Sequence, residues 1–365
     1  MSVKIDDLLR DLVGKDASDL HLKAGQPPIM RIHGELVRSN YPALSAAEAE
    51  ALLTSVLSEE RKKRLYEEKE LDLSYYVEGV ARFRVNMFWQ RHKLGAVFRV
   101  IPYKIRTIDE LRMPQVCKKL ALLPRGLILV TGPTGSGKST SLAAMIHHIN
   151  QTQRCHVMTI EDPIEYVHID QLSVINQREL GTDTYAFKEA LKHVMRQNPD
   201  TILVGEMRDL ETIMLAITAA ETGHLVFSTL HTVDAAQTID RIVDVFSPDQ
   251  QEQIRTQISV TLQGILSQSL IPTRDGKGRV AAFEALVATP SVRMLIREGK
   301  TFQIPSIMQV GKAHGMVSLN DALMDLVTKK LVAPDEAYSK AVDKPGFEGL
   351  LKRAGINTSF ATAGS

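Results

Sequence analysis

The stretch that most constrains this chain is a short apolar run followed by a glycine-rich loop. Residues 127–131 read Leu-Ile-Leu-Val-Thr, which is typical of a buried strand, and residues 132–139 read Gly-Pro-Thr-Gly-Ser-Gly-Lys-Ser. A helix-like stretch follows at 141–149. Glycines let the backbone turn tightly and direct its N–H groups inward, where they and the helix N-terminus bind phosphate oxygens. The strand, loop and helix together predict a nucleoside triphosphate site.

Each residue of this loop has an expected role. Lys138 would contact the β- and γ-phosphates, and the Ser139 hydroxyl would bind a Mg²⁺ ion, so ATP and Mg²⁺ are the expected cofactors. The predicted nucleotide-binding residues of the loop are Gly132, Pro133, Thr134, Gly135, Ser136, Gly137, Lys138, Ser139 and Thr140. The alternative is a glycine-rich turn that binds nothing, and the matching strand and helix on either side disfavour it.

Carboxylates follow two other predicted strands. They are Glu161, Asp162 and Glu165 after the strand predicted at 156–160, and Glu206 after the strand predicted at 201–205. Because parallel strands end at the same edge of a sheet, these acids should converge on the phosphates. One of Glu165 and Glu206 would orient the attacking water, and the other would hold the hydrated Mg²⁺ ion. Glu206 is the predicted metal ligand. The residues leave open which does which, and Glu206 could instead be an exposed cap of the next helix.

Two histidines and two arginines are further candidates. His224 and His231 flank a predicted buried strand, where an imidazole could report whether the γ-phosphate is present, although a structural role is equally open. Arg84 and Arg99 lie on predicted strands in the first hundred residues. An arginine from a neighbouring domain or subunit can stabilise the transition state of phosphoryl transfer, whereas each of these taken alone reads as a solvated strand residue.

Composition limits the class of protein. At 365 residues the chain can form two domains, and 44% hydrophobic with 24% charged residues is ordinary for a globular protein. The net charge of +1 predicts no general attraction to nucleic acid. Cys117 and Cys155 lack CxxC spacing, which favours reduced thiols in the cytoplasm. No apolar run reaches the roughly 20 residues of a membrane span, so membrane association would require a partner.

The pattern of apolar residues predicts two architectures. The first hundred residues mix helix-like and strand-like segments, as in an α+β domain, with a hairpin at 29–37. From 127 to 229, strands alternate with helices at 138–150, 185–197 and 209–221, which predicts a mostly parallel sheet covered on both faces. Beyond about residue 250 the chain reads as largely helical, with one strand-like patch at 279–287.

Four motifs occur in an order that resembles a known family. They are the loop 132–139, the acidic box Glu-Asp-Pro-Ile-Glu-Tyr at 161–166, Gly-Glu-Met-Arg-Asp at 205–209, and Thr-Gly-His at 222–224 with Leu-His-Thr at 230–232. Together they resemble the Walker A, Asp, Walker B and His boxes of the secretion-type traffic ATPases. Ser-Asp-Leu-His-Leu at 18–22 looks like the start of the short pilus members. Residues 291–298 are similar to the Ala-Ile-Arg-Asn-Leu-Ile-Arg-Glu signature of type IV pilus retraction ATPases, departing from it at Ser291, Val292 and Met294.

The resemblance implies a fold and a set of domains. They are a PAS-like α+β domain, placed at 1–101, and a RecA-like ATPase core at 114–290 with a C-terminal helical region at 291–356. The polar connection at 102–113 is the predicted linker, and the small, polar residues at 357–365 predict a disordered tail. ATP would lie between the two domains, with Arg84 and Arg99 among the residues that reach it.

The resemblance also implies a motor. Members form a homohexameric ring in the cytoplasm that docks on the inner-membrane pilus platform protein. ATP hydrolysis there drives pilin subunits out of the filament, which powers retraction and twitching motility. A retraction paralogue is a further expected partner. Extension and type II secretion ATPases carry a longer N-terminal region and a four-cysteine zinc module, neither of which this sequence has.

Three other interpretations compete with a retraction motor. The chain could be the accessory retraction paralogue, which usually lacks the 291–298 signature. It could be a nucleic-acid translocase, although the near-neutral charge and the lack of a basic-aromatic stretch disfavour that class. It could also be a regulator that binds ATP without hydrolysing it, which the presence of Lys138, Glu165, Glu206, Arg84 and Arg99 disfavours.

Overall fold

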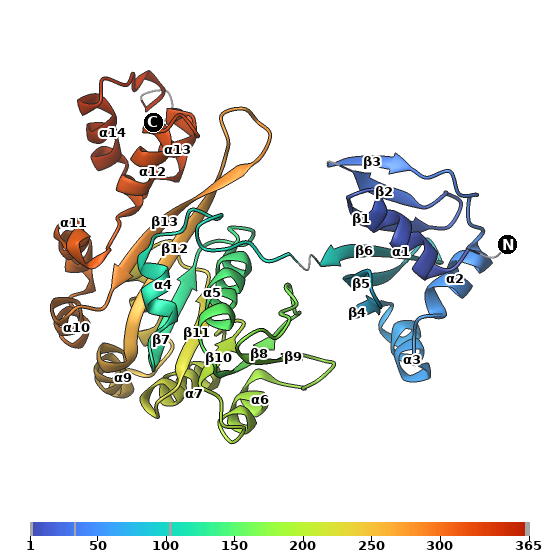
Figure 1. The fold of residues 1–365 in the computed structure, drawn as a ribbon, viewed down its shortest axis with the longest axis horizontal. Helices are drawn as coiled ribbons and strands as arrows, with labels where there is room; N and C mark the ends of the chain where they lie inside the picture. Colours follow the sequence, from blue (N-terminus) through green and yellow to red (C-terminus); the bar gives the residue numbers. More distant parts are fainter. Residues whose placement is uncertain (1–2, 33, 102–103, 362–365) are drawn as a thin grey trace. The chain divides into compact units, whose positions relative to one another are not determined.

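The computed structural model describes residues 3–32, 34–101 and 104–361 (Figure 1). The chain divides into two compact units. One comprises Met1–Lys104 with Glu165–Val167, and the other Ile105–Ile164 with His168–Ser365. The predicted linker at 102–113 includes residues 102–103, which lie outside the described residues, and the predicted domain boundaries stay predictions.

The first unit is built on a six-stranded antiparallel sheet in the order β3-β2-β1-β6-β5-β4. Its strands are β1 (Ala17–Lys23), β2 (Ile29–Ile32), β3 (Glu35–Arg38), β4 (Glu70–Val77), β5 (Ala81–Gln90) and β6 (Lys93–Ile101), and its helices α1 (Ile5–Gly14), α2 (Ala46–Thr54) and α3 (Glu59–Glu68). Leu8 and Leu12 lie one helical turn apart on α1 and are fully buried in the core with Phe83 and Phe98. The predicted hairpin is β2–β3, and His33 within it lies outside the described residues.

The second unit contains a seven-stranded sheet in the order β13-β12-β7-β11-β10-β8-β9. Its strands are β7 (Gly126–Thr131), β8 (His156–Glu161), β9 (Val174–Glu179), β10 (Thr201–Val204), β11 (Leu225–Leu230), β12 (Leu262–Pro272) and β13 (Arg279–Val287). Neighbouring strands are parallel except β12 and β13. Strand β9 is an edge strand of this sheet, and the sequence pattern did not predict it.

Both faces of this sheet are buried, which is why its strands are continuous apolar runs. Along β7, Leu127 and Leu129 pack in the core with α7 and α9, whereas Ile128 and Val130 pack in a second core with α4 and α5. The helices are α4 (Val116–Ala121), α5 (Lys138–Thr152), α6 (Phe187–Val194), α7 (Leu210–Glu221), α8 (Ala235–Val243) and α9 (Pro248–Thr261). Figure 1 shows α5 and α7 on opposite sides of the sheet.

The C-terminal part is helical. Its elements are α10 (Pro290–Arg297), η1 (Thr301–Gln303), α11 (Ile304–Val310), η2 (Gly311–His314), α12 (Leu319–Thr328), α13 (Pro334–Lys340), α14 (Lys344–Arg353) and η3 (Ser359–Ala361). Helices α12 to α14 enclose a core of their own around Leu323, Phe347 and Leu351. An antiparallel-sheet domain followed by a parallel-sheet domain with C-terminal helices confirms the predicted fold class.

Two predictions for the C-terminal half are wrong. The largely helical region beyond 250 contains β12, an eleven-residue strand. Its apolar residues Leu262, Ile265, Leu266 and Leu270 recur at helical spacing, but pairing with β7 on one side and β13 on the other makes the segment a strand. The predicted disordered tail at 357–365 begins with order, because η3 forms there and the Phe360 ring lies 5.7 Å from that of Tyr338. Residues 362–365 lie outside the described residues.

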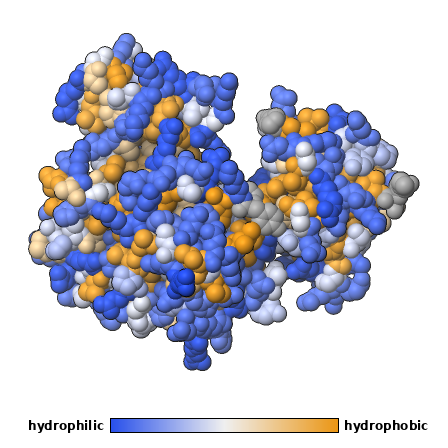
Figure 2. All heavy atoms as spheres, in the orientation of Figure 1, coloured by the Kyte–Doolittle hydropathy of each residue, from blue (hydrophilic) through white to orange (hydrophobic). Residues whose placement is uncertain are grey.

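The surface is mostly hydrophilic. Figure 2 shows charged and polar residues over most of the visible face, with hydrophobic residues scattered among them. Scattered apolar side chains are normal for a globular surface. Among the described residues, no helix is both long enough and apolar enough to cross a membrane.

Candidate active site

The glycine loop has the local structure that the sequence predicts. Strand β7 ends at Thr131, the loop follows, and α5 begins at Lys138. Gly132, Gly135 and Gly137 have φ angles of 144°, 76° and 90°, in a region that side chains with a Cβ rarely adopt. The loop therefore meets the helix N-terminus with backbone N–H groups available for an anion.

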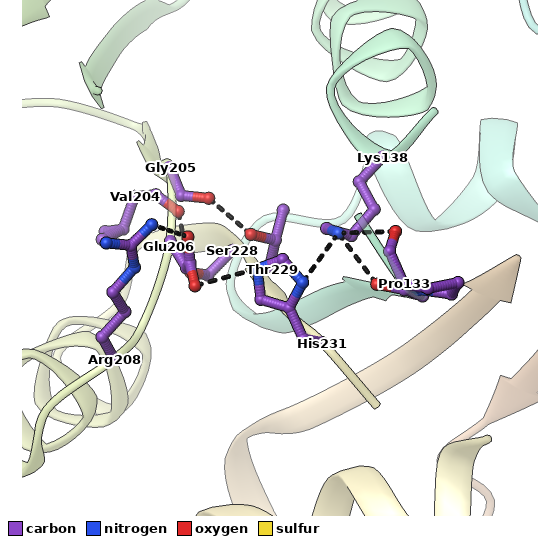
Figure 3. Close-up of polar contacts among 10 residues, drawn as sticks. Pro133, Lys138, Val204, Gly205, Glu206, Arg208, Ser228, Thr229 and His231 are labelled. Atoms are coloured by element: carbon purple, nitrogen blue, oxygen red, sulfur yellow. Dashed lines mark hydrogen bonds and ion pairs between the residues drawn. The ribbon is translucent and has the colours of Figure 1, made fainter. Parts of the chain in front are cut away.

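The side chain of Lys138 bonds back to the start of its own loop. Its Nζ donates to the carbonyl oxygens of Gly132 at 2.8 Å and Pro133 at 3.2 Å, and it lies 3.4 Å from Nδ1 of His231 (Figure 3). The two carbonyl oxygens are uncharged acceptors, so the charged oxygens of a phosphate could replace them with stronger hydrogen bonds to the ammonium group.

Glu206 and His231 are in direct contact at the same edge of the sheet. Glu206 follows β10 and His231 follows β11, and Nε2 of His231 lies 3.0 Å from Oε1 of Glu206. Hydroxyl groups of β11 hold the end of β10 in place, because Ser228 donates to the carbonyl of Val204 and Thr229 to that of Gly205, at 2.7 and 2.6 Å. Figure 3 shows the resulting series Glu206, His231, Lys138.

Arg208 contacts the other oxygen of Glu206. Its guanidinium lies 2.9 Å from Oε2. Burial alone would raise the pKa of Glu206, but the hydrogen bond and charge of Arg208, with the nearby His231 and Lys138, outweigh it and lower that pKa. Glu206 is therefore held as a carboxylate. Arg208 belongs to the Gly-Glu-Met-Arg-Asp motif at 205–209, but its contact with Glu206 was not predicted. The only sign of this contact in the sequence is that Arg208 follows the acid by two residues.

The acidic box lies at the end of β8, beside β10. Glu161 accepts hydrogen bonds from Thr159 at 2.6 Å and Gln177 at 3.0 Å. Gly205 packs against it so closely that a Cβ there would lie 3.3 Å from the Cα of Glu161. The charge of Asp162 contributes to raising the pKa of Arg208, after the contribution of Glu206. The structure therefore brings Glu161, Asp162 and Glu206 to one edge, as expected for parallel strands.

The structure separates the two histidines and corrects the expectation for His224. His224 precedes β11 and His231 follows it, so the six-residue strand lies between them. Nδ1 of His224 lies 3.0 Å from the carbonyl oxygen of Ala219, near the end of α7. Since the P-loop lies at the C-terminal ends of the strands, His224 is at the wrong end to contact a nucleotide bound to the loop of its own chain.

The first unit brings Arg84 and Arg99 together. They are directly opposite each other on β5 and β6, a relation that their spacing in the sequence does not reveal. Arg99 also forms an ion pair of 2.8 Å with Asp19 on β1, whose side chain is 5% exposed. Asp19 was not singled out as a site residue, and its only signal was its place in the Ser-Asp-Leu-His-Leu stretch. Glu165 belongs to the same unit.

Two cavities border the site within the second unit. The larger, about 570 Å³, is bordered by the loop residues Ser136, Gly137 and Thr140, and Arg106, Arg112 and Arg279 also line it. A smaller cavity of about 380 Å³ is lined by Glu206, Arg208 and His231. Glu110 also lines the larger cavity, whose charged residues together still carry a net positive charge, which suits the phosphates of a nucleotide bound at the loop.

The donor groups near the loop suit Mg²⁺. Ser139 lies in the first turn of α5, directly after Lys138, and offers a hydroxyl oxygen, while Glu206 offers a carboxylate. Mg²⁺ prefers oxygen ligands and is usually bound by one or two protein groups together with phosphate oxygens. The predicted ligands Ser139 and Glu206 therefore fit this ion.

The chain is similar to a protein family, to characterised relatives and to a solved structure. The family model described as type II/IV secretion system protein matches residues 2–304. The chain is 51% identical over 337 residues to the type IV pilus retraction ATPase PilT of Pseudomonas aeruginosa, covering 92% of this chain and 98% of the relative. It is 52% identical over 314 residues to a twitching motility protein of Neisseria gonorrhoeae, covering 86% and 84%. A solved structure of the pilus retraction motor PilT with bound ADP aligns with a TM-score of 0.89 and 45% identity, covering 95% and 99%.

Proposed function

The chain belongs to the type II/IV secretion system protein family, as a PilT-like type IV pilus retraction ATPase, and on that premise we propose how its residues use ATP. The observation that carries the proposal is the series Lys138, His231, Glu206, whose contacts of 3.4 and 3.0 Å connect the P-loop to the acid after β10. Through these contacts, a movement of Lys138 toward a phosphate would change the contacts of His231 and, through His231, those of Glu206.

The roles follow from the positions. Lys138 and the loop N–H groups bind the β- and γ-phosphates. Ser139, with Glu206, would hold Mg²⁺, which supplies charge neutralisation on the phosphates. A carboxylate, Glu206 or Glu165, orients the attacking water. Arg84 and Arg99 stabilise the charge of the transition state. Their paired position on β5 and β6 supports a joint role.

Phosphate binding would rearrange the series. When Lys138 moves to the phosphates, it leaves the carbonyl oxygens of Gly132 and Pro133 and the imidazole of His231. His231 is then free to contact the γ-phosphate, and Glu206 loses one of its partners. Loss of the γ-phosphate reverses these contacts, and a local change of this kind can drive a movement of domains.

The assembly is also part of the proposal. We place the motor in a homohexameric ring in the cytoplasm, docked on the pilus platform protein at the inner membrane. Work is then done as each subunit hydrolyses ATP and pilin subunits leave the filament. An accessory retraction paralogue is a candidate partner. The support is the similarity to a retraction ATPase and to a retraction motor over nearly the whole chain.

A deletion strain tests this function. Surface pili are counted and surface motility is scored, with rescue by the wild type or by Lys138→Ala. We expect abundant pili without motility, rescued by the wild type alone, because the variant loses contacts to phosphate. Circular dichroism of purified Lys138→Ala checks that its fold is intact. Bald cells would mean extension instead of retraction, and rescue by Lys138→Ala would contradict a function driven by ATP.

A further inference from the structure

Gln268 on β12 contacts the P-loop from the side of the larger cavity, whose lining it shares with Ser136 and Gly137. Its side chain is buried, with the residue 3% exposed, and Nε2 donates a hydrogen bond of 2.6 Å to the carbonyl oxygen of Ser136. The register explains the contact, because Ser267 pairs with Thr131, the residue before the loop. The backbone is equally close, since a Cβ on Gly132 would lie 2.4 Å from the Gln268 carbonyl oxygen.

This hydrogen bond determines which way one peptide group points. The carbonyl of Ser136 and the N–H of Gly137 belong to the same planar trans peptide, so they point in opposite directions. With the Ser136 carbonyl bound to Gln268, the N–H of Gly137 points away from Gln268. Gly137 has a φ of 90°, and a glycine there tolerates more than one orientation of this peptide. In the flipped orientation a carbonyl oxygen would face the phosphates and repel them.

Stability alone does not account for a glutamine at this position. Oε1 of Gln268 and Oγ of Ser136 are buried, and neither has a hydrogen-bond partner among the described residues. An incompletely satisfied polar pair is a poorer core contact than two apolar side chains of similar shape. The orientation of the amide is nevertheless defined, because the Ser136 carbonyl can only accept a hydrogen bond and must face Nε2.

We propose that Gln268 is a positioning residue of the ATP site, which holds the Ser136–Gly137 peptide so that its N–H group faces the phosphates. The proposal deepens the proposed function and rests on ATP binding at the P-loop. Gln268 acts through the Ser136–Gly137 peptide of the loop.

Two variants test the hydrogen bond. Gln268→Glu keeps the shape, but an ionised carboxylate cannot donate and repels the Ser136 carbonyl. A protonated carboxyl can donate again, so lower pH should restore binding. Gln268→Met is similar in size and has no donor at any pH. Affinity for a fluorescent ATP analogue with Mg²⁺ is measured between about pH 6 and about pH 8.5. Ser269→Ala, on the same strand, is the matched control.

At the higher pH we expect Kd to rise by about tenfold or more in both variants, because one hydrogen bond is lost and the loop peptide is released. At the lower pH, Gln268→Glu should recover toward the wild type, while Gln268→Met should not. Wild-type affinity in both variants across this range would overturn the proposal. If Gln268→Glu does not fold, as judged by circular dichroism, wild-type affinity of folded Gln268→Met overturns it. If the wild type itself fails to bind, the proposed function fails instead.

Discussion

Oε1 of Glu206 lies 3.0 Å from Nε2 of His231, so the acid after β10 and the histidine after β11 form one unit at the edge of the sheet. Arg208 contacts the second carboxylate oxygen at 2.9 Å. Each oxygen of Glu206 thus has a side-chain partner. Each oxygen can accept a further hydrogen bond, so the carboxylate can orient a water while His231 and Arg208 fix its position.

The first prediction concerns which carboxylate orients the attacking water. We expect Glu206→Gln to bind ATP with nearly unchanged Kd but to lower kcat by about 10²–10⁴-fold, the range lost with a general base. The amide keeps the shape of the side chain but cannot accept a proton. Steady-state ATPase kinetics and nucleotide binding are measured together, with Glu165→Gln in parallel. If Glu206→Gln hydrolyses ATP at the wild-type rate, Glu206 is not a catalytic carboxylate, and a loss confined to Glu165→Gln would give that role to Glu165.

The second prediction separates the two histidines. His231→Gln should lower kcat by about tenfold or more, corresponding to roughly 1.4 kcal/mol, because it breaks the series between Lys138 and Glu206. His224→Gln should leave kcat within about threefold of the wild type, since His224 contacts the end of α7 at the other end of β11. ATPase assays of the two proteins under the same conditions provide the comparison. An equal loss of kcat in the two variants would show that lying at the P-loop end of β11 does not determine which histidine acts in ATP hydrolysis.

The third prediction concerns the support of Arg99. Asp19 is buried and pairs with Arg99 at 2.8 Å. Burial would raise the pKa of Asp19, but the Ser18 hydroxyl and Arg99 lower it overall, below its ordinary value of 3.8. The pair therefore stabilises the fold above this value, and the stabilisation is lost as pH falls through the lowered pKa. Asp19→Asn should cost about 1–3 kcal/mol at neutral pH and less in acid.

Denaturant unfolding followed by fluorescence of the single tryptophan, Trp89, reports on the first unit that contains Asp19. The matched control is Glu59→Gln, which removes an ion pair with Lys62 in which the glutamate side chain is 90% exposed. Such surface pairs contribute little to stability. A loss in Asp19→Asn no larger than in this control would mean that Arg99 does not depend on Asp19. A kcat that stays at the wild-type level would argue separately against a transition-state role for a positioned Arg99.

Local patterns predicted much of the fold and the site, and tertiary pairing decided the rest. The strand, loop and helix around Lys138 are contiguous in the sequence, so their pattern was sufficient. Strand β12 was missed because Leu262, Ile265 and Leu266 have helical spacing and only two neighbouring strands make the segment extended. The same miss hid Gln268, which reaches the loop through the register of β12.

Register also explains the limits on the site residues. The 15-residue spacing of Arg84 and Arg99 carries no sign that they face each other, because that relation depends on the turn between β5 and β6. Both histidines flank a buried strand, and only one end of that strand can lie beside the P-loop. A parallel sheet supplies that direction, since β7 and β11 run the same way.

The last prediction concerns Glu284, a buried acid on β13 outside the proposed chemistry. It accepts a hydrogen bond of 2.8 Å from the backbone N–H of Ala235, the first residue of α8, four residues after His231. Burial, together with the charge of Asp234, raises the pKa of Glu284 from its ordinary 4.5 to about 7 against the opposing backbone hydrogen bonds. In the folded protein the group therefore holds its proton to a higher pH than it does in the unfolded chain.

The sign of the effect on stability follows from this difference. Between about pH 4.5 and about pH 7 the folded state binds more protons than the unfolded state, so stability falls as pH rises, by up to about 3 kcal/mol. Glu284→Gln cannot ionise and should lack this fall. Relative to the wild type, the variant should therefore gain stability from about pH 5 to about pH 8. Denaturant unfolding followed by circular dichroism measures the difference, with the exposed Glu252→Gln on α9 as the control. A difference between Glu284→Gln and the wild type that stays constant across this range would mean that Glu284 ionises at an ordinary pH and that its burial is compensated.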